Sequence, residues 1–345
     1  MRELSVVILN WNGRALMEAF LPSVLAYTPQ DIAEIVVADN GSIDGSIAML
    51  KEKFPSVRLI QLDRNYGFAE GYNKALEQVD TEYTVLLNSD VEVTEGWINA
   101  PLQTMKRDKN IACAQPKIRV QRNREYFEYA GAAGGYLDRY GYPFCRGRVL
   151  HVVEKDAGQY DDMVDVLWVT GACLFIRTAV YKAEGGLDST FFAHQEEIDM
   201  CWRLRSRGYR LVCTPQSVVF HVGGATLDAE NPRKTYLNFR NSLLMLYKNL
   251  PEADLCHVMR TRFWFDYIAA GRFGLSGRFD NVKAIYTARR DFYRLRPAYT
   301  DVREENLRKA VLYNIPELMC GSLILAFYLK GLRTAGQLLR KLRPK

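Results

Sequence analysis

Residues 85–93 read Val-Leu-Leu-Asn-Ser-Asp-Val-Glu-Val, and this stretch decides the fold. The apolar run at 85–87 is typical of a buried parallel strand, and the polar step at 88–90 marks its end. Open α/β sheets bind ligands at the carboxyl ends of their strands. Asp90 is therefore expected where a carboxylate can meet a metal ion and a phosphate, with capping of the next element as the simpler alternative.

The first 87 residues alternate between short β-branched runs and stretches with helical spacing. Strands are expected at 4–9, 34–39, 57–62 and 83–87, separated by helices and turns. This alternation indicates βαβ units, so we predict an α/β fold with a mostly parallel central sheet and flanking helices. The polar ends of the early strands should open beside Asp90. Neither a G-x-G-x-x-G motif nor a P-loop follows the first strand, which disfavours dinucleotide-binding and P-loop folds.

Three acids begin a helix that is expected at 196–207. Glu196, Asp199 and Arg203 share one face, with ion-pair spacing between the last two, whereas Glu197 points about 100° away from Glu196. Acids in a first helical turn also suit the helix dipole, which is the simpler explanation. Crowding beside aromatic residues would raise a carboxylate pKa toward that of a general base.

His221 ends an expected strand at 218–221 and precedes a Gly-Gly pair. A lone histidine is more often structural than a ligand. Paired with an aspartate such as Asp90, it becomes a second candidate ligand for a divalent cation.

Cysteine and charge distributions bear on location. The seven Cys are scattered and include no C-x-x-C pair, and the N-terminus shows no signal peptide, so a cytoplasmic protein is expected. Residues 256–345 carry 18 Lys and Arg against 7 Asp and Glu, although the whole chain sums to only +6. This basic region favours anionic lipid or nucleic acid as a partner.

The most apolar run lies inside the basic region, at residues 315–329. It is too short, and too interrupted by Glu317, for a transmembrane helix of ~20 residues. Lys and Arg follow it, and an apolar helix running into a cationic one suits a membrane surface. We expect membrane contact rather than nucleic-acid binding, with a packed helix and a solvated tail as the alternative.

Six motifs, taken in order, resemble those of family 2 glycosyltransferases. They are SVVILNWNG at 5–13, VADNGSIDGS at 37–46, NYGFAEGYN at 65–73, LLNSD at 86–90, TGAC at 170–173 and EEIDMCWR at 196–203. The likeness is strongest to the rhamnosyltransferase-like branch that builds bacterial surface polysaccharides. It implies a GT-A domain at 1–235, with a nucleotide-binding half at 1–110 and an acceptor half at 111–235, before a helical basic region at 236–345.

The resemblance also implies residue roles. Residues implied to bind the nucleotide are Asn10, Trp11, Asn12, Asp39, Asn65, Gly67, Phe68, Asn73, Asn88 and Ser89. Residues implied to border the donor sugar and the acceptor are Trp168, Thr170 and Gly171. Asp90 and His221 would hold Mg²⁺ or Mn²⁺. Glu197 would be the catalytic base, positioned by Arg203, with Glu196 and Asp199 as rivals.

Two positions depart from the family pattern. Asn88 stands where the D-x-D motif has its first Asp, so it brings no charge to the metal. Glu197 stands where Asp is commoner, and its side chain is one methylene longer.

The implied activity is inverting transfer of a sugar from a nucleotide-diphosphate donor to a hydroxyl of a lipid-linked glycan acceptor. The donor would be a dTDP- or UDP-sugar, with dTDP-rhamnose as one candidate. The enzyme would sit on the inner face of the cell membrane, with no nucleic-acid partner, and a homodimer is left open. The alternatives are a catalytically silent scaffold that binds nucleotide sugar and a sugar nucleotidyltransferase, which would lack an evident Gly-rich, Lys-bearing triphosphate loop.

Overall fold

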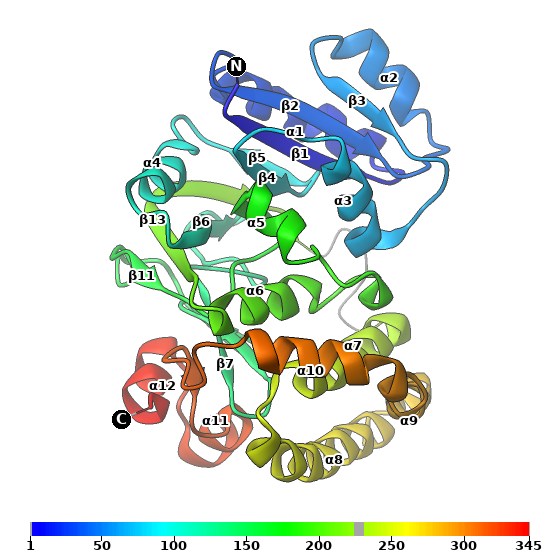
Figure 1. Ribbon diagram of the computed structural model, residues 1–345, viewed down its shortest axis with the longest axis vertical. Helices are drawn as coiled ribbons and strands as arrows, with labels where there is room; N and C mark the ends of the chain where they lie inside the picture. Colours follow the sequence, from blue (N-terminus) through cyan, green and yellow to red (C-terminus); the bar gives the residue numbers. More distant parts are fainter. Residues whose placement is uncertain (1, 224–230, 345) are drawn as a thin grey trace.

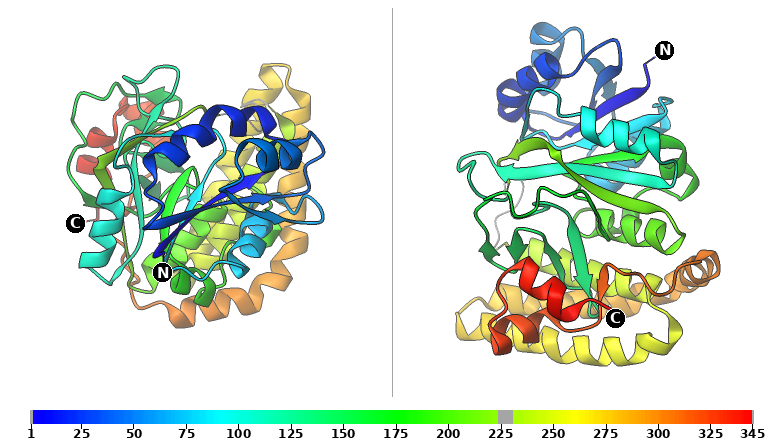
Figure 2. Two further views of the ribbon diagram at one scale, coloured as in Figure 1. Left: turned by 90° about the horizontal axis from the view of Figure 1, so that it is seen from above. Right: turned by 90° about the vertical axis from the view of Figure 1, so that its left-hand side faces the viewer.

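A large mixed sheet forms the centre of the molecule. The computed structural model describes residues 2–223 and 231–344. Nine strands join in the order β11-β13-β6-β12-β4-β1-β2-β3, with β5 paired to β13 (Figure 1). Helices flank this sheet, and a helical layer built from the C-terminal part of the chain closes one end of the molecule (Figure 2).

The N-terminal half of the sheet is parallel, as the alternating sequence predicts. It comprises β1 (Leu4–Asn10), β2 (Ala33–Asp39), β3 (Arg58–Gln61) and β4 (Tyr83–Leu87). The connections contain α1 (Arg14–Tyr27), α2 (Ser46–Lys53) and α3 (Gly67–Glu77). Asn10 lies opposite Asp39 in the β1–β2 register. The polar ends of these strands therefore meet at one edge.

The other half of the sheet mixes directions. It contains β5 (Val91–Val93), β6 (Ile111–Val120), β11 (Val164–Asp165), β12 (Cys173–Arg177) and β13 (Arg210–His221). Strand β12 runs antiparallel between β4 and β6, and β5 runs antiparallel to the end of β13. The β5–β13 register places His221 opposite Val91, directly beside Asp90 in the chain.

Helices cover both faces of the sheet. Apolar residues of α1, α2 and α4 (Asn99–Arg107) pack in the core on one face. Residues of α3, α5 (Thr178–Ala183) and α6 (Glu196–Ser206) pack in the core on the other. The second face carries the acidic start of α6, so the predicted catalytic acids share a face with the nucleotide-side helix α3.

A second, smaller sheet has the order β10-β9-β8-β7-β14. Its strands are β7 (Gly135–Asp138), β8 (Pro143–Cys145), β9 (Arg148–Val149), β10 (Val152–Val153) and β14 (Leu318–Met319). The apolar run at 315–329 is thus not one helix. It forms β14, parallel to β7, and then the short helix α11 (Leu323–Lys330). Pro316 and Gly321 disfavour a continuous helix there.

The C-terminal region is helical and basic, as predicted. Its remaining helices are α7 (Pro232–Asn249), α8 (Glu252–Leu275), α9 (Phe279–Leu295), α10 (Thr300–Lys309) and α12 (Ala335–Leu342). Asn231 caps α7, its side-chain oxygen accepting from the Arg233 amide at 2.9 Å. In the described ranges, no helix combines the length and the apolar character needed to cross a membrane.

Candidate active site

The polar rim begins where β1 and β2 end. Asn10 Nδ2 donates to Asp39 Oδ2 at 2.9 Å, and the Ser42 amide donates to Asp39 Oδ1 at 2.9 Å. Asn10 Oδ1 is buried without a partner. A Cβ on Gly13 would lie 2.5 Å from that oxygen, which explains the glycine. The rim is thus a rigid carboxylate-amide pair with one unused acceptor.

The turn after β1 is locked to the turn after β2. Asn12 adopts a positive φ of 50°. Its amide donates to Ser42 Oγ at 2.9 Å, and its Oδ1 accepts from the Ile43 amide at 2.8 Å. Trp11, between these anchors, leaves 51 % of its surface exposed. An exposed indole held beside a polar rim can stack on a flat ring.

The start of α3 touches a loop from far along the chain. Gly67 has a φ of 78°, and a Cβ there would lie 2.5 Å from the ring of Phe192. The Phe68 amide donates to the Phe192 carbonyl at 2.7 Å. Asn65 Oδ1 accepts from the Gly67 amide at 2.8 Å. Only glycine permits this approach, which brings residues 192–195 against the nucleotide-side turn.

Asn73 lies farther along α3 and binds protein rather than open space. Its Nδ2 donates to the Leu187 carbonyl at 2.8 Å, and its Oδ1 accepts from the Leu187 amide and the Tyr181 hydroxyl. The structure thus gives Asn73 a bridging role between α3 and the segment before α6.

Asp90 and His221 meet as the strand register requires. His221 Nε2 lies 3.0 Å from Asp90 Oδ1 and 3.5 Å from Asn88 Nδ2. Glu128 Oε1 lies 3.4 Å from His221 Nδ1, without hydrogen-bond geometry. Burial alone would lower the pKa of His221, but the carboxylates of Asp90 and Glu128 outweigh it and raise that pKa to about 10. For Asp90, burial would raise the pKa, but the bond from His221 outweighs it and the pKa is lowered.

Both carboxylate oxygens of the buried Asp199 are paired with other side chains. Its Oδ2 contacts Arg203 Nε at 3.1 Å and Lys248 Nζ at 2.7 Å, and its Oδ1 accepts from Asn249 Nδ2 at 2.9 Å. Burial would raise its pKa, but the positive charges of Lys248 and Arg203 outweigh it and lower that pKa. An ionised carboxylate tied to two cations is a poor proton acceptor. The expected Asp199–Arg203 ion pair is confirmed.

Glu196 and Glu197, unlike Asp199, each have a carboxylate oxygen without a partner and a raised pKa. Oε2 of each is buried without a hydrogen-bond partner. Burial raises the pKa of Glu197 to about 7, and burial together with the charge of Glu197 raises that of Glu196 well above its usual value. Glu196 is buried, whereas Glu197 keeps partial exposure. Glu197 is therefore the acid best placed to exchange a proton near neutral pH.

A buried thiol lies within the electrostatic influence of both carboxylates. Burial raises the pKa of Cys145, on β8, and the charges of Glu128 and Glu197 add to this rise while Arg148 opposes it, which gives a pKa of about 11. Glu128 contacts His221, which contacts Asp90. That Asp90 and Glu197 face one shared site stays a prediction.

A family model matches the N-terminal part of the chain. Residues 5–162 match the family model described as glycosyl transferase family 2. Residues 5–162 therefore form a family 2 glycosyltransferase domain.

Curated relatives extend beyond that match. An N-acetylglucosaminyl-diphospho-decaprenol L-rhamnosyltransferase of Mycobacterium tuberculosis is 25 % identical over 232 residues, covering 63 % of this chain and 75 % of the relative. The O-antigen biosynthesis protein RfbC of Myxococcus xanthus is 26 % identical over 235 residues, covering 66 % of this chain and 18 % of that protein. These relatives support the rhamnosyltransferase-like branch.

Solved structures share the fold. S. aureus TarS 1–349 in complex with UDP-GlcNAc aligns with a TM-score of 0.55 at 16 % identity, covering 90 % of this chain and 89 % of that one. The mannosyltransferase PcManGT from Pyrobaculum calidifontis, in complex with GDP-Man and Mn²⁺, aligns with a TM-score of 0.52 at 14 % identity, covering 91 % and 87 %. The predicted GT-A fold is confirmed.

The glycosyltransferase domain offers a divalent cation two ligands. Across residues 2–223 and 231–344, no group of three or more His, Cys, Asp or Glu is arranged to hold a metal ion. A carboxylate oxygen from Asp90 suits Mn²⁺, and an imidazole nitrogen from His221 suits it once the cation displaces the proton that the raised pKa otherwise keeps on the ring. A cation that also binds phosphate oxygens needs only one or two protein ligands. The donor set therefore fits a cation shared with a diphosphate.

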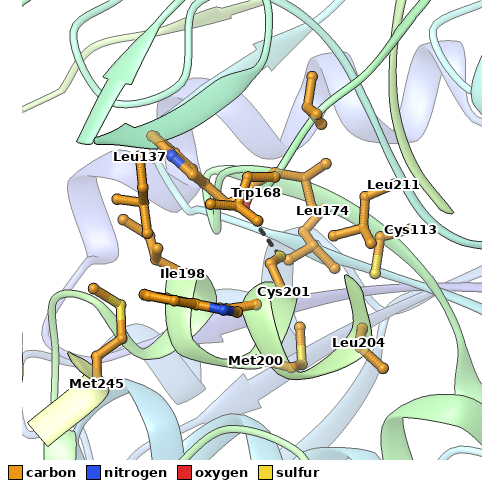
Figure 3. Packing of buried hydrophobic residues seen from close by; sticks show 14 of the residues in the cluster. Cys113, Leu137, Trp168, Leu174, Ile198, Met200, Cys201, Leu204, Leu211 and Met245 are labelled. Atoms are coloured by element: carbon orange, nitrogen blue, oxygen red, sulfur yellow. Dashed lines mark hydrogen bonds between the residues drawn. The ribbon is translucent and has the colours of Figure 1, made fainter. Parts of the chain in front are cut away.

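Trp168, Thr170 and Gly171 lie in the core of the domain. Trp168 is 2 % exposed, and its Nε1 donates to the Tyr136 carbonyl at 3.0 Å. Figure 3 shows its ring among buried side chains of α6, with Ile198 and Cys201 nearby. The Thr170 amide donates to Gln115 Oε1 at 3.0 Å. In this structure these residues are buried, and contact with a bound sugar stays a prediction.

Two site neighbours escape sequence reasoning. Glu128 lies in a Tyr-, Gly- and Arg-rich stretch with no recognisable motif, and its approach to His221 depends on the tertiary fold. Asn241, on α7, donates through Nδ2 to the carbonyls of Phe191, Ala193 and His194. This clamp holds the turn before Glu196, and a buried helical Asn was the only available signal.

Proposed function

We propose that this glycosyltransferase is an inverting enzyme in which Glu197 deprotonates an acceptor hydroxyl opposite a diphosphate held near Asp90 and His221. The observation that carries the proposal is the state of Glu197. It is partly exposed, has an unpartnered Oε2, and has a pKa that burial raises to about 7.

The donor would lie along the rim of β1, β2 and β4. The exposed Trp11 offers a nucleobase a stacking surface, whereas Asn10 and Asp39 are fully buried, so a base would reach them only after a neighbouring side chain moves aside. Asn65, Gly67 and Phe68 would shape the wall beside the ribose, and Asn88 and Ser89 would lie under the diphosphate. A UDP- or dTDP-sugar suits this rim, because the N–H of either pyrimidine base can donate to Asp39.

The chemistry is a single displacement. A bound Mg²⁺ or Mn²⁺ would offset the negative charge that develops on the leaving diphosphate. Asp90 and His221 would hold that cation. Glu197 Oε2 would take the hydroxyl proton as the acceptor oxygen forms its bond to the anomeric carbon and the bond to the diphosphate breaks. Attack from the face opposite the leaving group inverts the configuration. Arg203 and Lys248 keep Asp199 charged and paired, so it positions α6.

The acceptor would be a lipid-linked glycan of the cell surface. The relatives named for decaprenol-linked rhamnose transfer and for O-antigen biosynthesis support this assignment. Such an acceptor places the enzyme at the inner face of the cell membrane, and the basic C-terminal region suits that surface.

Exchange of single carboxylates tests the assignment. With Mn²⁺ and a panel of UDP- and dTDP-sugars, Glu197→Gln should lower kcat by about 10²–10⁴-fold while leaving nucleotide binding intact, because only the proton acceptor is lost. Glu196→Gln is the matched control one residue away and should retain most activity. A larger loss for Glu196→Gln would transfer the role of base to Glu196. Donor binding without turnover in the wild type would favour the silent scaffold.

A further inference from the structure

We propose that the outer faces of α8 and α9 form a docking surface for an anionic bilayer. This inference rests on the proposed function, because it names the surface through which the enzyme would reach a lipid-linked acceptor. It places the contact on α8 and α9 rather than on the C-terminal run at 315–329, which is divided between strand β14 of the small sheet and helix α11.

The outer face of α8 is apolar although nothing covers it among the described residues. Trp264 is 66 %, Ile268 68 % and Leu275 93 % exposed. These residues are spaced by four and seven positions, so they lie on one side of the helix. An apolar stripe exposed along a helix marks an interaction surface rather than a chance exposure.

Aromatic contacts extend this stripe to α9. The ring centroids of Trp264 and Phe263 are 5.4 Å apart, those of Phe263 and Tyr267 4.6 Å, and those of Tyr267 and Tyr286 5.1 Å. Tyr286 lies on α9 and is itself exposed. The docking surface is therefore the continuous set Phe263, Trp264, Tyr267, Ile268, Leu275 and Tyr286. Trp and Tyr are the side chains that favour the interface between headgroups and acyl chains.

The opposite face of α8 is fixed in the protein. Arg262 donates to the Tyr140 carbonyl and to Ser242, both at 2.8 Å, and pairs with the buried Asp266, which also pairs with Arg289 of α9. These bonds prevent α8 from rotating its apolar stripe inward. The stripe from Trp264 to Leu275 therefore stays exposed along about 17 Å of the helix. Helix α8 itself lies at the outermost end of the molecule (Figures 1 and 2).

Charge identifies the bilayer as the occupant. Arg260 and Arg272 lie one helical turn before Trp264 and after Ile268, and Lys283 and Arg290 flank Tyr286 on α9; all four are exposed. Within residues 263–294, all of which are described, Asp280 is the one exposed acid. A self-complementary contact would set these cations against one another, whereas an anionic lipid surface attracts them.

A shallow groove of about 440 Å³ between α7 and α9 lies beside the docking surface, and its lining includes Arg233, Lys283 and the acid Asp280. The Arg233 guanidinium lies 5.0 Å from the ring centroid of Phe192, the residue packed on Gly67. One residue of the groove thus contacts the segment that precedes α6.

Vesicle sedimentation tests the proposal. The purified full chain is mixed with phosphatidylcholine vesicles that contain phosphatidylglycerol. Trp264→Gln/Ile268→Gln should lower binding about tenfold or more, because two inserted side chains are lost. Ile43→Gln, an exposed isoleucine on the N-terminal side of the molecule, is the matched control and should bind as wild type does. Pure phosphatidylcholine vesicles should bind the wild type less tightly.

Other outcomes would overturn the proposal. Unchanged binding by the double variant, or equal binding to neutral and anionic vesicles, excludes this surface as an anionic lipid contact. Self-association of the wild type in analytical ultracentrifugation that the double variant abolishes would assign the surface to a second copy. Turnover with a detergent-free, short-chain acceptor should be the same in the double variant and in the wild type. Absence of that turnover in both the wild type and the double variant would count against the proposed function. The vesicle result would still decide whether this surface binds lipid.

Discussion

Glu197 binds a proton more tightly in the folded chain than an ordinary glutamate does, because burial disfavours its charged form. Its pKa rises from 4.5 to about 7. A raised pKa contributes stability that is present below about pH 4.5 and is lost as the pH rises through about 7. Glu197→Gln should therefore raise the free energy of unfolding by about 1–3 kcal/mol at about pH 8 and by much less at about pH 5. Urea unfolding at both values measures this.

Asp199→Asn, in the same helix, should change the free energy of unfolding in the opposite direction. The pKa of Asp199 is lowered, so its pairing with Lys248 and Arg203 stabilises the fold above its unfolded pKa, and the substitution should destabilise the protein at about pH 8. Shifts of the same sign in both variants would contradict the assigned charge states.

Single residues could be predicted where a motif fixes chemistry and backbone position together. Asp90 and His221 come from distant motifs, and the strand register brings them to 3.0 Å. Trp168 shows where this reasoning ends. A Trp in a short motif is compatible with a sugar-stacking wall or with a core, and only the packing against Gly135 and the bond to Tyr136 places it in the core.

At the scale of elements, the turn into α3 depends on one glycine. Gly67→Ala introduces a strained positive φ and also a methyl group within 2.5 Å of the Phe192 ring. Gly185→Ala is a matched control, because Gly185 has the same φ of 78° and no atom within 4 Å of an added Cβ. Strain alone should cost about 1 kcal/mol in each variant, and overlap should add about 1–3 kcal/mol for Gly67→Ala.

Unfolding free energies and turnover together check this prediction. Gly67→Ala should also lower activity, because the 192–195 turn that it displaces leads directly into Glu197. Equal stability and equal activity in the two variants would show that the contact with Phe192 contributes to neither.

Helices and strands could be predicted where the hydrophobic periodicity and the turn-forming residues gave the same boundaries, as in β1 to β4 and their helices. The direction of β12 was not, because a strand's apolar pattern is the same whether it runs parallel or antiparallel. The run at 315–329 misled for a related reason. Its hydrophobicity is compatible with a lipid-facing helix, but the run is divided between strand β14, whose partner β7 lies about 180 residues earlier in the chain, and the short helix α11.

The whole molecule is tied together through α6. Arg205 of this helix pairs with Glu317 just before β14, with 2.9 Å between Nε and Oε2, and both side chains are more than 90 % buried. Sequence alone predicted a catalytic domain with a helical basic region behind it. The structure shows instead that the last part of the chain contributes to the second sheet and to the packing behind the catalytic helix.

Glu317→Ala should therefore act on the whole fold and not on the C-terminal segment alone. It leaves the Arg205 guanidinium buried without its counter-charge, and breaking one side of such a pair costs about 3–5 kcal/mol. Glu305→Ala is the control, because Glu305 pairs with Lys309 on the surface of α10 and its loss should cost about 0.5 kcal/mol or less. Urea unfolding followed both by far-ultraviolet circular dichroism and by a fluorophore on Cys320 measures both variants. For Glu317→Ala the two signals should shift together to lower urea, since β14 and α6 unfold as one unit. Early release of the Cys320 signal, with the rest of the transition unchanged, would show that the C-terminal segment is a separable appendage.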